Sequence, residues 1–276
     1  MFIPVHPWFN SRVRKQQKIP VALTVAGSDS GGGAGMQADL KTFAALGVHG
    51  VSATTCVTAQ NPRRISGVEA CSPRIVRAQL EAVFDELPPQ AAKTGMLFST
   101  EIIREVVRAF REKPCSLVVD PVMLATSGAR LLQTDALETL TRDLFPLATL
   151  ITPNLPEAEA LLGICIREPE DLRRAARALH ERFGCAALIK GGHLPRTRES
   201  IDVLFDGRTE WLFRSTRVRG VKTHGTGCTY SAAVAAHLAR GRELVAAVRL
   251  AKEFITAAIA SSRRAGGHSV LNWSAR

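Results

Sequence analysis

The sequence predicts an α/β protein with a mostly parallel central sheet, helices on both faces and an antiparallel hairpin at one edge. Short apolar segments that suit buried parallel strands alternate with amphipathic segments that suit helices. Each apolar segment is followed by glycine or polar residues, as expected where a strand ends and a crossover connection begins. In such folds, residues that bind ligands gather at the carboxyl ends of the strands.

The first strand is expected at 21–26, followed by the glycine-rich loop 27–35 and a helix that begins at about Met36. This loop lacks both the Gly-Lys-Ser/Thr ending of a Walker loop and the GxGxxG spacing of a dinucleotide site. Two segments, 201–205 and 209–213, flank an Asp-Gly turn and predict the edge hairpin. The remaining strands are expected at 51–58, 91–95, 117–119, 150–152 and 187–189, and helices at 73–86 and 100–112.

The composition predicts one folded domain in a reducing compartment. The chain has 276 residues, of which 46% are hydrophobic and 22% charged, enough for a sizeable core. No apolar run approaches the roughly 20 residues of a membrane-spanning helix, so we expect no membrane partner. The six cysteines are scattered without a CxxC pair, which argues against a zinc site or a disulfide framework and indicates the cytoplasm.

The net charge of +11 is compatible with nucleic-acid binding, but its distribution argues against it. The arginines are spread through helical segments and the chain has a single tyrosine, so no localised basic and aromatic surface is found. We therefore expect no nucleic-acid partner and interpret the charge as one that attracts small anionic ligands.

Residues 1–19 differ from the rest of the chain. They contain four basic residues and no acidic one, without the continuous apolar core of a secretory signal. Pro4, Pro7 and Pro20 would interrupt the helix of a transit peptide. We expect a disordered extension, or a start assigned too early, ahead of a single domain at residues 20–276.

Polar side chains follow three neighbouring strands. Asp120 follows the strand at 117–119, Asn154 and Glu157 follow the one at 150–152, and Lys190-Gly191-Gly192 follows the last. Phosphoryl transfer needs magnesium held by carboxylates and water, donors around the phosphates and a base. This set favours phosphoryl transfer, although Asp120 could cap a turn, Glu157 could be an ordinary first-turn carboxylate and Lys190 a surface lysine.

The stretch His224-Gly225-Thr226-Gly227-Cys228-Thr229 precedes a run of small residues that predicts a helix. A glycine turn that opens a helix makes a site for phosphate. Beside a helix N-terminus the thiolate of Cys228 would be favoured, so Cys228 could serve as base or nucleophile. The alternative is a buried, small apolar residue behind a plain turn.

Taken together, these motifs resemble hydroxymethylpyrimidine/phosphomethylpyrimidine kinase, a thiamin-pathway family of the ribokinase-like fold. The resemblance runs from about residue 20 to the C-terminus, with the motifs in family order. They are AGSDSGGGAGMQADLKTF at 26–43, TAQN at 58–61, KTGML at 93–97, DPVM at 120–123, TPNLPEAE at 152–159, KGGH at 190–193 and THGTGCT at 223–229.

The resemblance implies a three-layer α/β/α fold and an ATP-dependent enzyme that uses Mg²⁺. Its acceptor would be 4-amino-5-hydroxymethyl-2-methylpyrimidine and then the monophosphate of that compound, which yields the diphosphate used to build thiamin. A homodimer is also implied. The nearest alternative is a pyridoxal/pyridoxine kinase, and a non-catalytic pyrimidine-binding regulator is a second one.

The resemblance also implies roles for residues. The pyrimidine pocket would be lined by Gly27, Asp39, Gln60, Met96 and Val122. Asp39 and Gln60 would hydrogen-bond the aminopyrimidine edge, and Met96 and Val122 would pack against the ring faces. The resemblance further implies that Cys228 is the base and that Gly225, Thr226, Gly227 and Cys228 form the N–H anion hole. Asp120, Asn154 and Glu157 would lie around the phosphates, with Asp120 and Glu157 as magnesium ligands. Lys190, Gly191 and Gly192 would lie beside the nucleotide.

Two positions depart from the family pattern. Lys222 stands where the family has asparagine, and the C-terminal signature appears as Gly267-His268-Ser269 rather than Gly-His-Gly. The second departure leaves the C-terminal contacts of the nucleotide open. Because the carboxylates and the anion loop are both present, the sequence favours an enzyme over a regulator.

Overall fold

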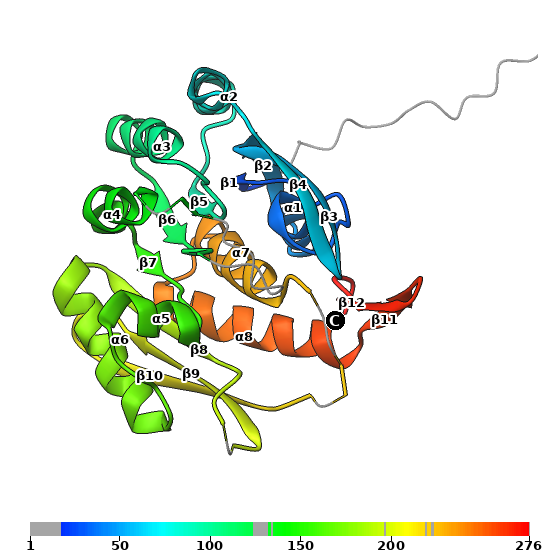
Figure 1. Ribbon diagram of the computed structural model, residues 1–276, viewed down its shortest axis with the longest axis vertical. Helices are drawn as coiled ribbons and strands as arrows, with labels where there is room; N and C mark the ends of the chain where they lie inside the picture. The colour runs from blue at the N-terminus through cyan, green and yellow to red at the C-terminus, as the bar shows by residue number, and fades with distance from the viewer. Residues whose placement is uncertain are drawn as a thin grey trace, which may run out of the picture.

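The computed structural model describes residues 18–123, 132–133, 135–195, 197–218, 220–221 and 224–275. Its centre is an eight-stranded sheet in the order β10-β9-β8-β7-β6-β5-β1-β2, in which β9 is antiparallel to both β8 and β10 and all other neighbours are parallel (Figure 1). The strands are β1 (Val21–Ala26), β2 (His49–Thr54), β5 (Ala91–Thr94), β6 (Ser116–Val119), β7 (Leu150–Ile151), β8 (Ala186–Gly191), β9 (Glu199–Phe205) and β10 (Glu210–Thr216).

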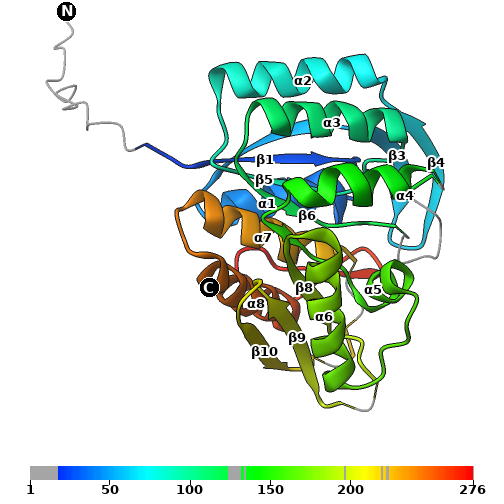
Figure 2. The same cartoon turned by 90° about the vertical axis from the view of Figure 1, so that its left-hand side faces the viewer.

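Helices cover both faces of this sheet. Figure 2 shows α2 and α3 lying side by side over one face. That face carries α2 (Pro73–Glu86), α3 (Thr100–Glu112), α4 (Ala136–Thr139) with η1 (Leu140–Leu144) and η2 (Phe145–Leu147), α5 (Leu155–Leu162) and α6 (Pro169–Phe183). The opposite face carries α1 (Gly35–Ala45), α7 (Thr226–Ala239) and α8 (Leu244–Ala260).

Alternation along the strands produces two apolar layers. Leu117 and Val119 of β6 pack toward α2–α6, whereas Val118 packs toward α7 and α8, and all three are fully buried or nearly so. The predicted α/β class, the mostly parallel sheet and the edge hairpin are therefore confirmed. Among the described residues, no helix is long and apolar enough to span a bilayer.

Small residues place α7 deep in the molecule. Its stretch Ala232–Ala236 is fully buried, and the helix packs on β5 and β6 as well as on α1 and α8. A helix that is apolar on all sides suits such a position. The packing directs the N-terminus of α7 to the carboxyl edge of the sheet.

One predicted strand is wrong. The segment 51–58 forms two strands, because the chain leaves the main sheet at Thr55, whose hydroxyl donates to the Met96 carbonyl at 2.6 Å. Beyond it, β3 (Cys56–Asn61) pairs with β4 (Arg64–Ala70) as a separate antiparallel ribbon. The sequence analysis missed β4, which is mostly exposed and lacks apolar alternation, and the short pair β11 (Arg263–Ala265) and β12 (His268–Val270).

Two sequence predictions concern residues outside the described part. The expected extension at 1–19 lies almost wholly there, and so does Lys222.

Candidate active site

A cavity of about 880 Å³ lies along the carboxyl ends of the parallel strands. One end is lined from the loops after β1 and β5 and from β3, the other from β9, α8 and the loop after β10. The N-terminus of α7 lies at the middle. Of the predicted site residues, the lining includes Gly27, Gln60, Met96, Val122, Asp120, Asn154, Glu157, Lys190, Gly192, Gly225, Thr226, Gly227 and Cys228.

The anion loop is fixed by a close backbone approach. Gly225 is the N-cap of α7 and has a φ of +80°, a conformation that glycine adopts at little cost. A Cβ at this position would overlap the carbonyl oxygen of Gly33 in the glycine-rich loop. The two loops are thus in contact, and the dipole of α7 favours an anion in front of them.

Cys228 is half-buried and lines the cavity at the first turn of α7. Burial raises the pKa of its thiol to about 11, with Lys93 opposing the shift and the carboxylates of Asp39 and Asp120 adding to it. The expectation that the helix N-terminus favours the thiolate is therefore wrong, because desolvation outweighs it. At neutral pH Cys228 is a thiol.

Slow alkylation of Cys228 follows from this pKa. With a pKa of about 11, the thiolate fraction at pH 8 is about 10⁻³ and rises about tenfold per pH unit. Peptide mass spectrometry after iodoacetamide treatment at pH 7–10 measures the rate, with exposed Cys165 as the reference thiol. A Cys228 alkylation rate that reaches a plateau below pH 9 would contradict the raised pKa of its thiol.

Asp39 does not line the cavity, which corrects its predicted contact with the aminopyrimidine edge. Its side chain is fully buried and accepts hydrogen bonds from Lys93 Nζ at 2.9 and 3.0 Å and from Thr24 Oγ1 at 2.6 Å. Burial opposes the charge of Lys93, but the adjacent Asp39 carboxylate outweighs it and raises the Lys93 pKa. Asp39 therefore pairs with the Lys93 ammonium and holds it in place. Lys93 lines the cavity, and no role was predicted for it from the sequence.

Gln60 lies on β3 and faces the anion loop. Its Nε2 atom lies 2.8 Å from His224 Nε2, and its Oε1 accepts from Thr58 Oγ1 at 3.2 Å. His224 Nε2 also lies 3.5 Å from Asp29 Oδ2. The amide of Gln60 is thus oriented by neighbours on two elements, and His224 joins the ribbon to the helix.

Asp29 folds the glycine-rich loop, a role that the sequence analysis missed. Its carboxylate accepts the N–H groups of Gly31, Gly33 and Ala34 at 2.8, 3.0 and 2.8 Å. An aspartate two residues before a run of glycines is a turn signal that could have revealed this role.

Three residues form the apolar wall beside Gln60. Met96 packs with the fully buried Cys56, and Val122 packs against both. Val122 has a φ of +39°, which a β-branched residue rarely adopts. Strain of this kind is concentrated at functional sites.

Gly27 leaves room for this wall, so Gly27→Ala is expected to raise the KM of a substrate bound against the wall about tenfold by shifting the wall. The added Cβ would stand 2.5 Å from Cys56 Sγ and 3.5 Å from Met96 Sδ. Steady-state kinetics with Gly27→Ala and with Gly27→Ala/Cys56→Ala test this, because the second change removes the obstructing sulfur. A KM that is normal in the single variant, or not recovered in the double variant, would count against the assignment.

Asp120 is held by two partners near the middle of the cavity. Its carboxylate accepts from Lys190 Nζ at 2.8 Å and from Ser231 Oγ at 3.0 Å. Burial opposes ionisation of Asp120, but Lys190 and Lys93 outweigh it and lower the Asp120 pKa. Ser231, one turn after the anion loop on α7, was not predicted as a site residue.

Asn154 and Glu157 form a capping box at the start of α5. Asn154 Oδ1 accepts the Glu157 N–H at 3.0 Å, and Glu157 Oε2 accepts the Asn154 N–H at 2.9 Å. The first-turn structural role is therefore present. Both residues also line the cavity, and the Glu157 pKa is raised by burial and by Asp120 against the influence of Lys190.

Gly191 does not itself line the cavity, whereas its neighbours Lys190 and Gly192 do. Its N–H donates to Asp202 Oδ1 at 2.9 Å. The sequence analysis did not single out Asp202.

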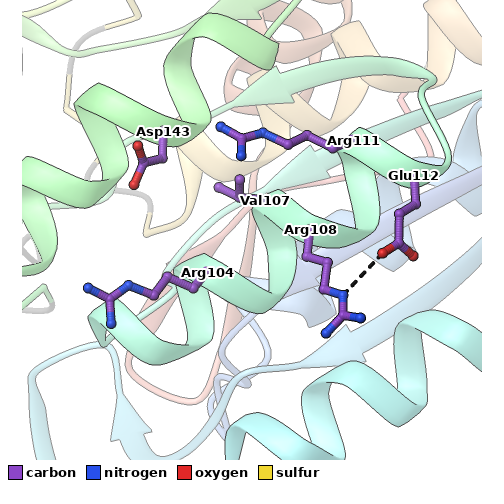
Figure 3. A pocket seen from close by; sticks show the side chains of 6 residues that line it. All are labelled: Arg104, Val107, Arg108, Arg111, Glu112 and Asp143. Atoms are coloured by element: carbon purple, nitrogen blue, oxygen red, sulfur yellow. Dashed lines mark hydrogen bonds and ion pairs between the residues drawn. The ribbon is translucent and has the colours of Figure 1, made fainter.

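A second hollow, of about 390 Å³, lies on the outer surface of α3. Figure 3 shows Arg104 and Arg111 on either side of Val107, with Asp143 close by and Arg108 directed to Glu112. Three arginines and two acidic side chains share this surface, which suits a solvated helix face. None of the predicted site residues contributes to it.

Comparison with known families identifies the family of the chain. The family described as phosphomethylpyrimidine kinase matches residues 29–272. The chain belongs to the phosphomethylpyrimidine kinase family. The resemblance drawn from the motifs is thereby confirmed, and the chain is a kinase.

Relatives of known name agree with this membership. The hydroxymethylpyrimidine/phosphomethylpyrimidine kinase of Streptomyces coelicolor is 48% identical, covering 90% of this chain and 91% of its own. The thiamine biosynthesis bifunctional protein ThiED of Geobacter sulfurreducens is 49% identical over 91% of this chain. The chain spans about half (51%) of the length of that relative.

Two groups of solved structures resemble this kinase. A phosphomethylpyrimidine kinase from Clostridium difficile has a TM-score of 0.76 at 43% identity, covering 87% of this chain and 98% of its own. An ADP complex of Bacillus subtilis pyridoxal kinase has a TM-score of 0.86 at 40% identity, covering 94% and 98%. The ribokinase-like fold is confirmed.

Proposed function

We propose that the chain transfers the γ-phosphoryl group of ATP to 4-amino-5-hydroxymethyl-2-methylpyrimidine and then to its monophosphate, in thiamine biosynthesis. One observation carries the proposal. A single cavity joins the small pocket at Gln60 and Met96 to the N-terminus of α7 and continues to β9 and α8. Family membership supports the same substrate class.

The residues along this cavity have different roles. Gln60, oriented by Thr58 and His224, offers its amide to the ring, while Met96 and Val122 pack against the ring faces. The anion loop at Gly225–Cys228 stabilises charge on the transferring phosphoryl group. Lys190, Gly192 and Asn154 border the phosphates of the nucleotide.

Cys228 acts at the hydroxyl end of the acceptor. Because its pKa is raised to about 11, Cys228 carries its own proton at neutral pH and is not available as a base before the reaction begins. A loose transition state needs little proton removal early, so orientation of the hydroxyl toward the phosphorus contributes more than deprotonation. We assign Cys228 to hold that hydroxyl through its neutral thiol, while the hydroxyl proton passes late to an oxygen of the transferred phosphoryl group.

Asp120 and Glu157 fit a magnesium ion. Both are nearly fully buried, line the same cavity and share one neutralising ammonium, that of Lys190, so a negative charge remains that, together with the nucleotide phosphates, a divalent cation would neutralise. Magnesium keeps several waters and binds through one or two carboxylates plus phosphates. When bound, it would neutralise charge on the phosphate oxygens, and Asp120 and Glu157 would orient it directly or through water.

A pyridoxal kinase activity is the second candidate. It is favoured by the TM-score of 0.86 to the Bacillus subtilis pyridoxal kinase. The Staphylococcus aureus pyridoxal kinase in complex with AMP-PCP and pyridoxal has a TM-score of 0.85 at 33% identity, covering 94% of this chain and 95% of its own. The higher identities to named pyrimidine kinases favour the first candidate.

A coupled ATP-turnover assay tests the proposal with three acceptors: the hydroxymethylpyrimidine, its monophosphate and pyridoxal. Turnover on both pyrimidines with much weaker turnover on pyridoxal supports the proposed function. Preference for pyridoxal would move the function to the second candidate. Binding of the pyrimidine without any turnover would instead support the regulator alternative.

Two wider predictions remain part of this proposal. All six cysteines are free thiols, as suits the predicted cytoplasm. The homodimer implied by the family is measured directly by light scattering on the purified protein.

A further inference from the structure

A buried ion pair lies at the end of the cavity opposite Gln60, and the mechanism above does not use it. Lys252 on α8 donates to Asp202 Oδ2 on β9 at 2.7 Å and to Ser200 Oγ at 2.8 Å. Lys252 is 7% exposed and Asp202 is 2% exposed. All three side chains line the cavity, so the pair is a part of its wall.

The second oxygen of Asp202 fixes the end of β8. Asp202 Oδ1 accepts the N–H of Gly191 at 2.9 Å. Asp202 is the partner of Lys190 in the antiparallel register of β8 and β9, so its carboxylate stands next to the point where β8 ends. A Cβ at Gly191 would overlap the Ile201 carbonyl oxygen, so the strands are in close contact here.

The backbone at Gly191 in turn sets the position of the Lys190 ammonium. Lys190 Nζ reaches Asp120 Oδ1 at 2.8 Å. It would lie 3.2 Å from a Cβ placed on Gly227, so it is close to the anion loop. A small rotation of the chain at Gly191 would move this ammonium away from both.

We propose that Lys252 is a positioning residue for the nucleotide: by holding Asp202, it fixes the Gly191 amide and with it the Lys190 ammonium beside Asp120 and the anion loop. The inference rests on the proposed use of ATP. Removing one partner of a buried ion pair leaves the other charge without compensation, so without Lys252 the Asp202 carboxylate turns toward water and releases Gly191. Misplacement of a binding group by about 1 Å can cost up to 100-fold.

The test compares Lys252→Met with Lys252→Met/Asp202→Asn. Asparagine keeps an oxygen for the Gly191 N–H and leaves no uncompensated charge. Calorimetry measures the Kd for ADP, and hydrogen exchange measures protection of the Gly191 amide. We expect Lys252→Met to weaken ADP binding about 10- to 100-fold and to speed Gly191 exchange, and the double variant to recover both to within about threefold.

The matched control is Arg249→Met on the same helix, which removes an exposed ion pair with Glu253 and is expected to change neither quantity. A double variant as weak as Lys252→Met would overturn the proposal, since Lys252 would then contact the nucleotide itself. Normal ADP binding by Lys252→Met would also overturn it.

If Lys252→Met does not fold, Lys252→Met/Asp202→Asn compared with the unchanged chain tests the same link, because it leaves neither charge of the pair uncompensated. Near-normal ADP affinity and Gly191 protection then support the proposal, and a loss beyond tenfold contradicts it. Because ADP binding is the readout, a chain that binds ADP but phosphorylates no pyrimidine would defeat the proposed function and leave this test intact.

Discussion

Replacing Cys228 with alanine is expected to lower kcat by about 10²- to 10³-fold and to change the Kd for the pyrimidine by less than about threefold. The thiol lines the cavity at the first turn of α7 but lies outside the wall formed by Cys56, Met96 and Val122. Its loss therefore removes the group that orients the acceptor hydroxyl while the ring contacts remain. Timed product assays measure kcat, and equilibrium binding of the pyrimidine measures its Kd separately.

The control for this change is Cys165→Ala, which removes an exposed thiol that does not line the cavity. It is expected to leave kcat and binding at their normal values. If Cys228→Ala turns over normally, Cys228 has no role in proton transfer or hydroxyl orientation, and the anion loop alone would have to account for the acceleration.

Replacing Gly225 with alanine is expected to be the most destabilising change in the cavity wall, by about 3 kcal/mol or more. Two costs add at this position. The φ of +80° is unfavourable for any side chain, and the new Cβ overlaps the Gly33 carbonyl oxygen. We expect the Tm to fall by about 6–12 °C and ATP turnover to be lost, because the glycine-rich loop and the anion loop must separate.

Gly241→Ala separates the two costs. Gly241 has a φ of +74°, but no atom lies within 4 Å of the position its Cβ would take. This control is expected to lose only the conformational part, about 1 kcal/mol, and to keep its turnover. Equal losses of Tm in the two variants would show that the contact with Gly33 contributes nothing to stability.

Periodicity and turn residues were sufficient to predict most of the fold. The alternation of apolar and amphipathic segments predicts the parallel sheet, and Asp206-Gly207 predicts the hairpin of β9 and β10. The ribbon of β3 and β4 was not predictable in this way. Strand β4 is mostly exposed, and although burial alternates along β3, its residues CVTAQN carry no period-2 apolar pattern. Thr55, at which the chain leaves the sheet, has no sequence signal of its own.

The candidate site shows a similar division. Rules on strand ends predict that Asp120, Asn154, Glu157 and Lys190 lie together, and all four line the cavity. Asp39 was misplaced because sequence spacing does not reveal that Lys93 is buried beside it. Likewise Asp202, His224 and Lys252 act through partners 11 to 195 residues away, which only the fold brings close.

The central claim is that one cavity carries two successive phosphorylations of a hydroxymethylpyrimidine. It is tested most directly by incubating 4-amino-5-hydroxymethyl-2-methylpyrimidine with excess ATP and following the products over time by mass spectrometry. We expect the monophosphate to appear first and then to be converted to the diphosphate. A chain that forms pyridoxal phosphate efficiently from pyridoxal while neither pyrimidine product accumulates would contradict it.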